Sequence, residues 1–326
     1  MTAAPATLVV GRHEISDLMA PGDWLGAVEA GFRAAAEGRA AAPPPMHIHG
    51  EGGAFHAKGA SLRLDRLYVA LKLNGNFPAN PDRLGLPTIQ GAILLCDGAN
   101  GRLLAVIDSI EVTLRRTAAA TALAAQLLAR PGSATVLVCG CGRQGAAQLE
   151  AVREVLPLQR CLAWDRDKTR AQRFARKMDA EPVDDLTEAA MASDVILCCT
   201  TATSPYLRQD MVRPGTFIAA VGADSPDKSE VDPALMRESA IVADVLGQCR
   251  LMGDLHHAIA AGLATAGGVR AELAQVLLGT ADGRRSQEEI VLFDSTGTAV
   301  QDVAACIRIY ERARERGSSL SLGLAA

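Results

Sequence analysis

The pattern of hydrophobic and polar residues along the chain changes near Ala134. Before it, apolar positions with helical spacing run through residues 14–38, and Pro21 predicts a break in that helix. Three short apolar runs then predict strands, at residues 67–73, 91–97 and 103–108. The dipeptide Asn100-Gly101 favours a hairpin between the last two, and the Pro-, His- and Gly-rich residues 39–60 are expected to be irregular. This part of the chain therefore predicts an α+β module with an antiparallel sheet.

A long alanine-rich helix is predicted from about Ser109 to Ala129, and Pro131 and Gly132 end it. Beyond it the pattern becomes strand, glycine turn and helix, repeated. Continuous apolar runs predict strands, at residues 134–140, 160–165, 194–200, 216–222, 240–246 and 289–294. Helices are expected between some of these strands and near the end of the chain, at residues 144–156, 168–179, 232–238 and 299–316. Apolar strands that alternate with helices predict an α/β fold, with a doubly wound parallel sheet covered on both faces.

Composition narrows the class of protein. Hydrophobic residues make up 49% of the 326 residues, which is typical of a globular chain with a large core. The formal net charge is -4, and both signs are spread along the chain, so nucleic acid is not expected as a partner. No apolar run approaches the roughly 20 residues of a membrane span. Residues 1–14 also lack the basic and apolar segments of a secretion signal.

Most of the eight cysteines lie inside apolar runs such as VLVCGCG and VILCCTT, without CxxC pairs or zinc-ligand spacing. We interpret them as small buried side chains in a reducing compartment, which favours a cytoplasmic location. His47, His49 and His56 cluster in the irregular segment, but no carboxylate shares their spacing, so no metal site is expected. This segment is expected to shape a substrate pocket.

The strongest motif is Gly140-Cys141-Gly142-Arg143-Gln144-Gly145, which follows a predicted strand and opens a predicted helix. Its three glycines match GxGxxG. The first permits a tight turn, the second lets the backbone approach a pyrophosphate, and the third allows close packing of helix and sheet. The helix N-terminus then presents free N–H groups to a phosphate. The sequence therefore predicts a Rossmann dinucleotide site, to which Arg143 and Gln144 also contribute.

Asp165 ends the second predicted strand, twenty residues beyond Gly145. An acidic residue there accepts hydrogen bonds from the ribose hydroxyls and disfavours a 2′-phosphate, which favours NAD. Arg166 and Arg170 follow at once and are suited to a 2′-phosphate, so NADP stays open as the alternative. A helix-capping role for Asp165 is the plain structural reading.

Several further segments occur in a fixed order from about residue 20 to residue 316: ALKLNGNFP, GAILLCDGANGRLLAVID, TLRRTAAATALAA, GCGRQG, CCTTATSPYL, RPGTFIAAVGADSPDKSEVD and LFDSTGTAVQDVA. With them the chain resembles the ornithine cyclodeaminase/μ-crystallin family. The family includes cyclodeaminases of basic amino acids, ketimine and iminosuccinate reductases, and some alanine dehydrogenases, and its members are typically dimers. The resemblance implies a homodimer. It also implies a substrate-binding and dimerisation domain, residues 1–118 with 299–326, into which a Rossmann domain, residues 119–298, is inserted.

The candidate residues for binding a substrate carboxylate are cationic side chains in the N-terminal part of the chain. Arg116 matches the family's substrate arginine, and its guanidinium can bind a carboxylate in a bidentate fork. Lys72 lies in an apolar strand, where an unpaired ammonium is costly to bury, and the resemblance favours a role as carboxylate partner or proton donor. Lys58 is a secondary carboxylate-binding candidate. Solvated helix or strand charges are the plain alternatives for Arg116 and Lys72.

Asp224 follows the strand TFIAAVG at the end where α/β proteins bind ligands. The resemblance implies that Asp224 handles the proton on the substrate nitrogen. Lys228 is expected to pair with it. The alternative is that Asp224 is only a polar residue of a turn. Candidate cofactor contacts complete the prediction, at Thr117, Thr200, Thr201 and Ser295. For Ser295, which precedes the last helix in DSTG, a simple helix cap is equally open.

Two departures from the cyclodeaminase pattern concern the substrate. The position of the family's carboxylate-binding arginine is occupied by Pro45, and the region of its acidic residue reads Gly52-Gly53-Ala54. Both departures weaken the prediction of ornithine cyclisation but leave the prediction of hydride transfer intact. We therefore expect an NAD(P)-dependent oxidoreductase that reduces a small imino or ketimino acid to an L-amino acid, or the reverse. A redox-neutral cyclodeaminase that uses bound NAD is the alternative, and a non-catalytic NAD(P)-binding protein of μ-crystallin type is the third reading.

Overall fold

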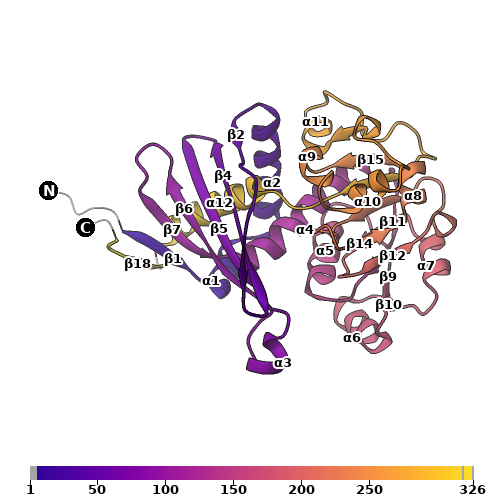
Figure 1. Cartoon of the computed structure of the whole chain (residues 1–326), viewed down its shortest axis with the longest axis horizontal. Helices are drawn as coiled ribbons and strands as arrows, with labels where there is room; N and C mark the ends of the chain where they lie inside the picture. Colours follow the sequence, from indigo (N-terminus) through magenta and orange to yellow (C-terminus); the bar gives the residue numbers. More distant parts are fainter. Residues whose placement is uncertain (1–5, 318, 325–326) are drawn as a thin grey trace. The chain divides into compact units, whose positions relative to one another are not determined.

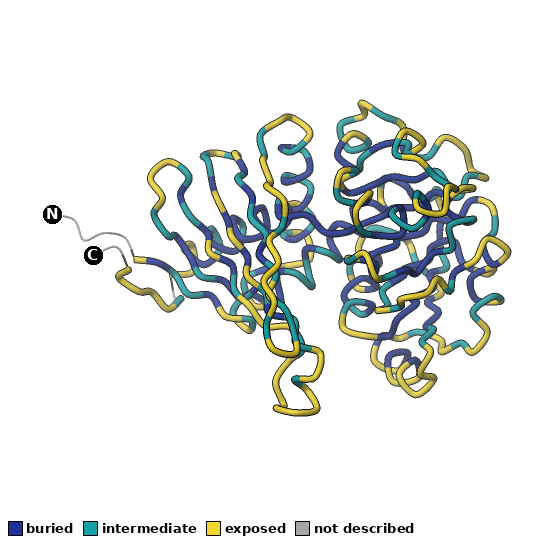
Figure 2. Tube along the Cα trace, viewed as in Figure 1, coloured by how far each residue is buried: buried dark blue, intermediate teal, exposed yellow. Residues whose placement is uncertain are grey.

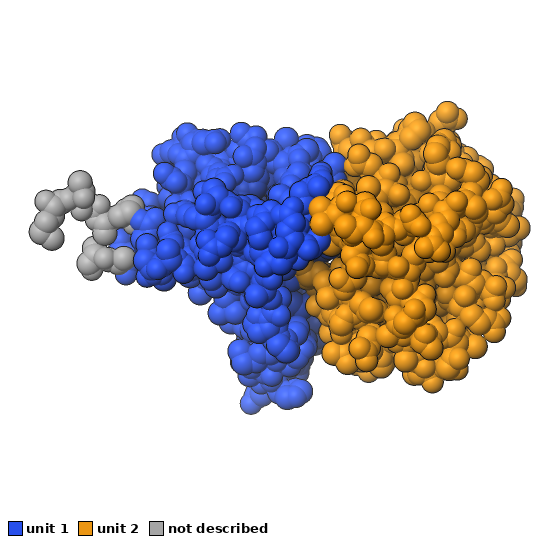
Figure 3. Space-filling model, turned by 90° about the horizontal axis from the view of Figure 1, so that it is seen from above, with its two compact units in different colours: residues 1–116, 299–326 blue, residues 117–298 orange. Residues whose placement is uncertain are grey.

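A computed structural model describes residues 6–317 and 319–324 of the chain. The chain divides into two compact units, coloured separately in Figure 3. Unit 1 consists of Met1–Arg116 and Ala299–Ala326, and unit 2 of Thr117–Thr298. Among the described residues, no helix is both long and apolar enough to cross a membrane.

Unit 1 is an α+β structure around one mixed sheet. Its elements are β1 (Thr7–Val10), α1 (Arg12–Leu18), α2 (Pro21–Ala36), β2 (Ala40–Ala41), β3 (Met46–Gly50), β4 (Gly53–Arg63), β5 (Leu67–Asn76), α3 (Asn80–Leu84), β6 (Ile89–Asp97), β7 (Leu103–Asp108), the start of α4 (Ser109–Leu128), α12 (Ala299–Arg316) and β18 (Leu320–Leu322). The strand order is β18-β1-β7-β6-β5-β4-β2, with β3 paired to β4. All pairs are antiparallel except β1 with β7.

Helix α12, from the end of the chain, packs against α2 and against strands β4 and β5 (Figure 1). The approach to α2 is close, because a Cβ at Gly31 would lie 3.0 Å from the Cβ of Ala304. Arg308 and Arg312 of α12 both bind Asp23 of α2, each at 2.8 Å. The helix therefore fastens the end of the chain onto the sheet that its first third builds.

The expectation of an irregular segment at residues 39–60 is wrong. This segment forms β2, β3 and most of β4, and β3 and β4 pair as an antiparallel hairpin. Met46, Ile48 and Phe55 are exposed apolar residues that alternate with polar ones, which is the period-two spacing of a strand. The prolines before residue 46 and the glycines at the turn conceal this spacing in the sequence.

Unit 2 is a doubly wound α/β structure. Its strands and helices are the rest of α4, β8 (Thr135–Cys139), α5 (Arg143–Arg153), β9 (Arg160–Trp164), α6 (Lys168–Met178), β10 (Glu181–Pro182), α7 (Leu186–Ala192), β11 (Val195–Cys198), β12 (Thr203–Leu207), η1 (Gln209–Met211), β13 (Phe217–Ala220), β14 (Ser229–Val231), α8 (Pro233–Glu238), β15 (Ala240–Ala243), α9 (Leu246–Cys249), α10 (Asp254–Ala260), η2 (Ala266–Gly268), β16 (Ala271–Glu272), α11 (Leu273–Leu277) and β17 (Val291–Asp294).

The main sheet of unit 2 is parallel throughout, in the order β10-β9-β8-β11-β13-β17-β15-β16. Its central strands β11, β13 and β17 are buried along their whole length, and they form the dark core of this unit in Figure 2. From β8 the order runs one way through β9 and the other way through β11, so the topological switch lies between β8 and β11. Ligands of such sheets bind outside the carboxyl ends of the strands at this switch. The α/β Rossmann fold expected from the sequence is confirmed.

Candidate active site

The glycine loop of unit 2 leaves β8 and enters α5 at the switch. Gly140 has a φ of +99°, and a Cβ there would lie 2.7 Å from the carbonyl oxygen of Cys199. A Cβ at Gly145 would lie 2.2 Å from the carbonyl oxygen of Gly140. By contrast, a Cβ at Gly142 would meet nothing within 4 Å, so this glycine faces open space at the N-terminus of α5. The loop thus has the tight turn, the close packing and the open backbone that a dinucleotide pyrophosphate needs.

Asp165 stands directly after β9. One of its carboxylate oxygens accepts a hydrogen bond from the backbone N–H of Cys141 at 2.9 Å, and the other accepts one from the N–H of Asp167 at 2.9 Å. The side chain that caps α6 is Asp167, which accepts from Thr169 and Arg170. Asp165 therefore braces the glycine loop, and its remaining lone pairs suit ribose hydroxyls. Arg166 is exposed next to it.

Ser295 is held by Asp244, a fully buried residue that the sequence did not single out. Asp244 Oδ2 accepts from the backbone N–H of Thr296 at 2.9 Å, from that of Gly297 at 2.7 Å and from the Ser295 hydroxyl at 3.2 Å. The turn after β17 is therefore fixed by one buried carboxylate. Its signal in the sequence is slight, because Asp244 is the single polar residue in AIVADVL.

Other predicted residues of unit 2 lie near the carboxyl ends of its strands. Thr200 and Thr201 follow β11, and Asp224 follows β13. Asp224 is exposed, and the expected pairing with Lys228 is present, with Lys228 Nζ 2.5 Å from Asp224 Oδ1. Thr117 is a half-buried residue of α4.

In unit 1, Lys72 and Arg116 share one buried carboxylate, Asp302 of α12. Lys72 Nζ lies 2.5 Å from Asp302 Oδ2, and Arg116 Nε lies 2.9 Å from Asp302 Oδ1. All three side chains are almost completely buried. Lys72 Nζ also donates to Thr113 Oγ1 at 3.4 Å. The two predicted substrate cations are thus brought together, and neither is a solvated surface charge.

The electrostatics of this cluster are set by burial and by mutual charge. Burial lowers the pKa of Lys72 to about 8, although the Asp302 charge opposes this shift. Burial alone would raise the pKa of Asp302, but the charges of Lys72 and Arg116 hold it below its usual value. The cluster therefore carries two cations and one anion near neutral pH.

Gln301, beside Asp302, completes the cluster. Its Oε1 accepts from Arg116 Nη1 at 2.7 Å, whereas its buried Nε2 has no partner among the described residues. A buried amide N–H without an acceptor is costly, and one beside an arginine suits a ligand carboxylate oxygen. Gln301 and Asp302 are not among the site residues predicted from the sequence. Their only local signal is a pair of polar residues inside the apolar first turns of a helix, AVQDVAAC.

Lys58 of β4 is the direct cross-strand partner of Lys72 of β5, so both side chains leave the same face of the sheet. The Lys58 charge contributes to the lowered pKa of Lys72. Next along the same face, His47 and His56 are register partners, with ring centroids 4.6 Å apart in an edge-to-face arrangement. Among residues 6–317 and 319–324, no three His, Cys, Asp or Glu side chains are grouped to hold a metal ion.

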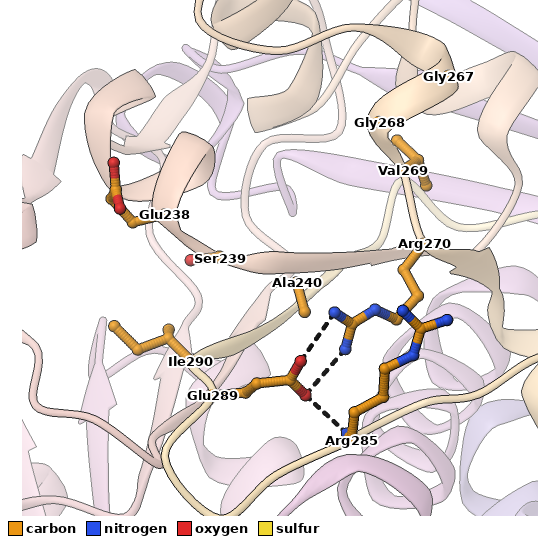
Figure 4. A pocket seen from close by; sticks show the side chains of 10 residues that line it. All are labelled: Glu238, Ser239, Ala240, Gly267, Gly268, Val269, Arg270, Arg285, Glu289 and Ile290. Carbon is orange, nitrogen blue, oxygen red and sulfur yellow. Dashed lines mark hydrogen bonds and ion pairs between the residues drawn. The ribbon is translucent and has the colours of Figure 1, made fainter.

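A cavity of about 400 Å³ in unit 2 lies at the amino ends of β15 and β17, away from the glycine loop of the same unit (Figure 4). Its central carboxylate, Glu289, binds the Arg270 guanidinium at 2.8 Å and the backbone N–H of Arg285 at 2.6 Å. These partners lower the pKa of Glu289 to about 2. The charges are balanced within the cavity, at the opposite edge of the sheet from the glycine loop, so we regard it as structural.

Comparison with known proteins identifies the family. The chain matches the ornithine cyclodeaminase/mu-crystallin family over residues 6–317. It is 36% identical to the alanine dehydrogenase of Archaeoglobus fulgidus over 310 residues, which is 94% of this chain and 95% of that protein. An archaeal alanine dehydrogenase dimer with bound NAD has a TM-score of 0.93 at 34% identity, with 98% of this chain and 99% of that one covered. The iminosuccinate reductase of Paracoccus denitrificans in complex with NAD+ has a TM-score of 0.89 at 31% identity, with 98% and 99% covered. The chain belongs to the ornithine cyclodeaminase/mu-crystallin family.

Proposed function

We propose that this protein is an NAD-dependent reductase of small imino or ketimino acids. In the reaction, the imino carbon gains a hydride and the nitrogen gains a proton, which yields an L-amino acid and the oxidised nucleotide. The reverse reaction oxidises the amino acid. The alanine dehydrogenase and the iminosuccinate reductase that this chain resembles are named for reactions of this kind.

The observation that carries the proposal is the buried cluster of Lys72, Arg116 and Asp302. Two cations share one carboxylate, so the cluster keeps one positive charge in surroundings where unbalanced charge is costly. A substrate carboxylate balances that charge, and the open N–H of Gln301 supplies a further donor for it. An acid whose carboxylate adjoins the reacting carbon fits both features.

Each candidate residue has a separate role in this proposed reaction. Arg116 and Lys72 hold the substrate carboxylate, and Lys58 is a secondary partner for it. With a pKa of about 8, Lys72 is also suited to donate a proton near neutral pH. Asp224 handles the proton on the substrate nitrogen. In the cyclodeaminase alternative the same residues serve a substrate with a second amino group.

The nucleotide site belongs to unit 2. Gly140, Gly142 and Gly145 leave backbone room for a pyrophosphate at the N-terminus of α5, and Arg143 and Gln144 open that helix. The carboxylate of Asp165 favours the ribose hydroxyls of NAD, with NADP as the alternative because of Arg166. Thr117, Thr200, Thr201 and Ser295 are further candidate contacts. The nicotinamide ring supplies and accepts the hydride.

We propose a homodimer formed through the outer face of the unit 1 sheet. This face exposes apolar side chains on neighbouring strands, which are Val69, Leu71, Leu73 and Leu94. A contiguous apolar patch on a sheet favours association, and the similar archaeal alanine dehydrogenase is a dimer. The eight free cysteines favour a reducing compartment such as the cytoplasm.

One assay tests the function. Purified protein is given NAD(P)H with a panel of 2-oxo acids and ammonia or methylamine, and separately L-ornithine with trace NAD. Stoichiometric loss of the reduced-nucleotide absorbance supports the reductase. Proline and ammonia without net change in the nucleotide would identify the cyclodeaminase. Nucleotide binding with neither reaction would identify a binding protein.

The role of Asp224 has its own test. Asp224→Asn keeps the size of the side chain but removes its charge and its proton-accepting capacity. We expect turnover to be abolished while NAD affinity is preserved, as measured by steady-state kinetics and a binding titration. Turnover within about tenfold of the wild type, roughly 1.4 kcal/mol of barrier, would show that Asp224 is misassigned.

A further inference from the structure

Glu230, on β14, is a fully buried carboxylate that joins two loops at the carboxyl edge of the unit 2 sheet. Its Oε1 accepts hydrogen bonds from the backbone N–H and the hydroxyl of Thr200, at 2.6 and 2.7 Å. Its Oε2 accepts from the backbone N–H of Gly222 at 2.7 Å. Thr200 lies in the loop after β11, Gly222 lies in the loop after β13, and these two strands are neighbours. One side chain therefore ties the two loops together.

The Glu230 carboxylate packs closely against both loops. A Cβ at Gly222 would lie 2.4 Å from Glu230 Oε2 and 2.4 Å from the carbonyl oxygen of Thr200, so no larger residue fits there. Two residues further on, the backbone N–H of Asp224 donates to the carbonyl of Gly222 at 3.1 Å. The position of Asp224 thus depends directly on the residue that Glu230 holds. On the other loop, Thr201 directly follows the anchored Thr200.

Among the residues that the structure describes, no cation pairs with the Glu230 carboxylate. Its fourth donor is the hydroxyl of Tyr206, at 2.9 Å, so all four donors are neutral. Burial, assisted by the nearby charge of Asp254, raises the pKa of Glu230 to about 7. A buried carboxylate without a cation costs stability, and an apolar residue of similar size would avoid that cost. What an apolar residue cannot supply is two acceptor oxygens that face two separate loops.

We propose that Glu230 is a positioning residue that clamps the Thr200 loop to the Gly222–Asp224 loop and so holds Asp224 in its working place. The proposal rests on the proposed function, in which Asp224 handles the substrate proton. In the ionised form both oxygens accept hydrogen bonds. Protonation turns one oxygen into a donor, so one of the four neutral donors loses its acceptor. The clamp is therefore tight above about pH 7 and looser below it.

The titratable groups that act on Glu230 come from several elements. Asp254 of α10 raises its pKa and Tyr206 of β12 lowers it. The thiols of Cys198 and Cys199 also interact with its charge. His257 of α10 acts through Asp254, whose pKa its charge lowers. Substitutions of Asp254 and Tyr206 should therefore move the titration of the clamp in opposite directions.

The first experiment needs no turnover. Hydrogen–deuterium exchange is measured by mass spectrometry at pH 8 on the full-length protein without nucleotide, for the wild type and Glu230→Gln. The glutamine offers one acceptor oxygen instead of two, so peptides that cover residues 199–202 and 221–224 should exchange faster by about tenfold. Glu289→Gln is the control, because it alters a half-buried glutamate at the other edge of the same sheet. It should leave the exchange of both loops unchanged.

The second experiment separates positioning from a purely structural role. In Glu230→Gln we expect kcat to fall about tenfold or more while KM changes little, because Asp224 is misplaced rather than removed. The wild-type profile of kcat/KM should have an acid limb near pH 7 that this variant lacks. Tyr206→Phe removes a donor to the ionised form and should move the limb up by about 0.5 unit. Asp254→Asn removes a like charge and should move it down by a similar amount.

Two results would overturn the proposal: unchanged exchange of both loops in Glu230→Gln, or a wild-type acid limb that persists in that variant. Limb shifts of the wrong sign in Tyr206→Phe and Asp254→Asn would do the same. If the wild type reduces none of the imino acids, the proposed function fails, and the exchange experiment alone decides the clamp.

Discussion

Unit 1 and unit 2 each contain a buried carboxylate at the centre of a cluster of polar contacts, yet the two carboxylates are held in opposite ways. Asp302 is contacted by two cations, Lys72 and Arg116, and its pKa lies below the usual value. Glu230 has four neutral donors, and its pKa is raised to about 7. Both side chains are almost completely buried, so burial does not explain the difference.

The groups that contact these two buried acids therefore decide which of them is ionised at neutral pH. A neutral donor stabilises the ionised form by a hydrogen bond, whereas a cation adds a Coulombic attraction that grows as water is excluded. Asp254 and Asp294 support this rule, because both are buried in unit 2 with backbone donors and both have raised pKa values. The buried Asp302 of unit 1 is thus held as an anion, whereas burial raises the pKa values of Glu230, Asp254 and Asp294 in unit 2.

The largest effect should follow from removing the anion of unit 1. Asp302→Asn leaves Lys72 and Arg116 buried without their carboxylate, and breaking such a pair typically costs about 3–5 kcal/mol. We expect a loss of this size in the free energy of unfolding, measured by urea denaturation at pH 7. Glu238→Gln, which breaks the exposed ion pair with Arg237, is the control and should cost at most about 1 kcal/mol. Equal losses in the two variants would contradict our account of the cluster.

The next largest effect is on the pH dependence of the free energy of unfolding. The pKa of Glu230 is raised on folding, from 4.5 to about 7, so its contribution is present below pH 4.5 and is lost as pH rises through about 7. At 1.4 kcal/mol per pKa unit, the contribution is roughly 3 kcal/mol. Unfolding titrations at pH 5 and pH 8 should therefore differ less in Glu230→Gln than in the wild type. An identical difference in both proteins would mean that Glu230 is already ionised at pH 5.

Lys72 gives a smaller effect, which appears in turnover. Its pKa is lowered from 10.5 to about 8, so the ammonium that we propose as a substrate-binding group is lost above that pH. We expect kcat/KM to fall about tenfold per unit above pH 8, because only the protonated form binds the carboxylate productively. Asp302→Asn removes the charge that raises this pKa, so it should move the alkaline limb to lower pH. A profile that stays flat to about pH 9.5 would exclude Lys72 as the group that titrates.

The smallest effect extends the comparison to a carboxylate at the edge of the protein. Asp165 is half-buried and accepts hydrogen bonds from two backbone N–H groups, and we propose that its remaining lone pairs bind the ribose of the nucleotide. Asp165→Ser should lower the preference for NAD over NADP by about tenfold, or about 1.4 kcal/mol, as measured by the ratio of kcat/KM values. An unchanged ratio would indicate that Asp165 only braces the glycine loop.

Local patterns were sufficient for much of the molecule. The apolar runs of unit 2 predicted its central strands, because a buried parallel strand must be apolar on both faces. The helix at residues 299–316 was predicted with its observed bounds. The glycine loop could be recognised because its three glycines are required by the space available around each of them, which a few neighbouring residues determine. An exception is the segment of residues 39–60, where prolines and glycines conceal the alternation of a strand hairpin.

The clusters themselves were decided by the tertiary structure. Arg116 and Asp302 are 186 positions apart, and no spacing along the chain relates them. Glu230 lies in the polar segment DSPDKSEVD of the sequence, and only folding surrounds it with four neutral donors. Sequence determines which groups are available and where regular elements form, since both depend on local chemistry. Whether an acid is an ion or titrates near neutral pH depends on which distant groups share its buried space, and only the folded chain determines that.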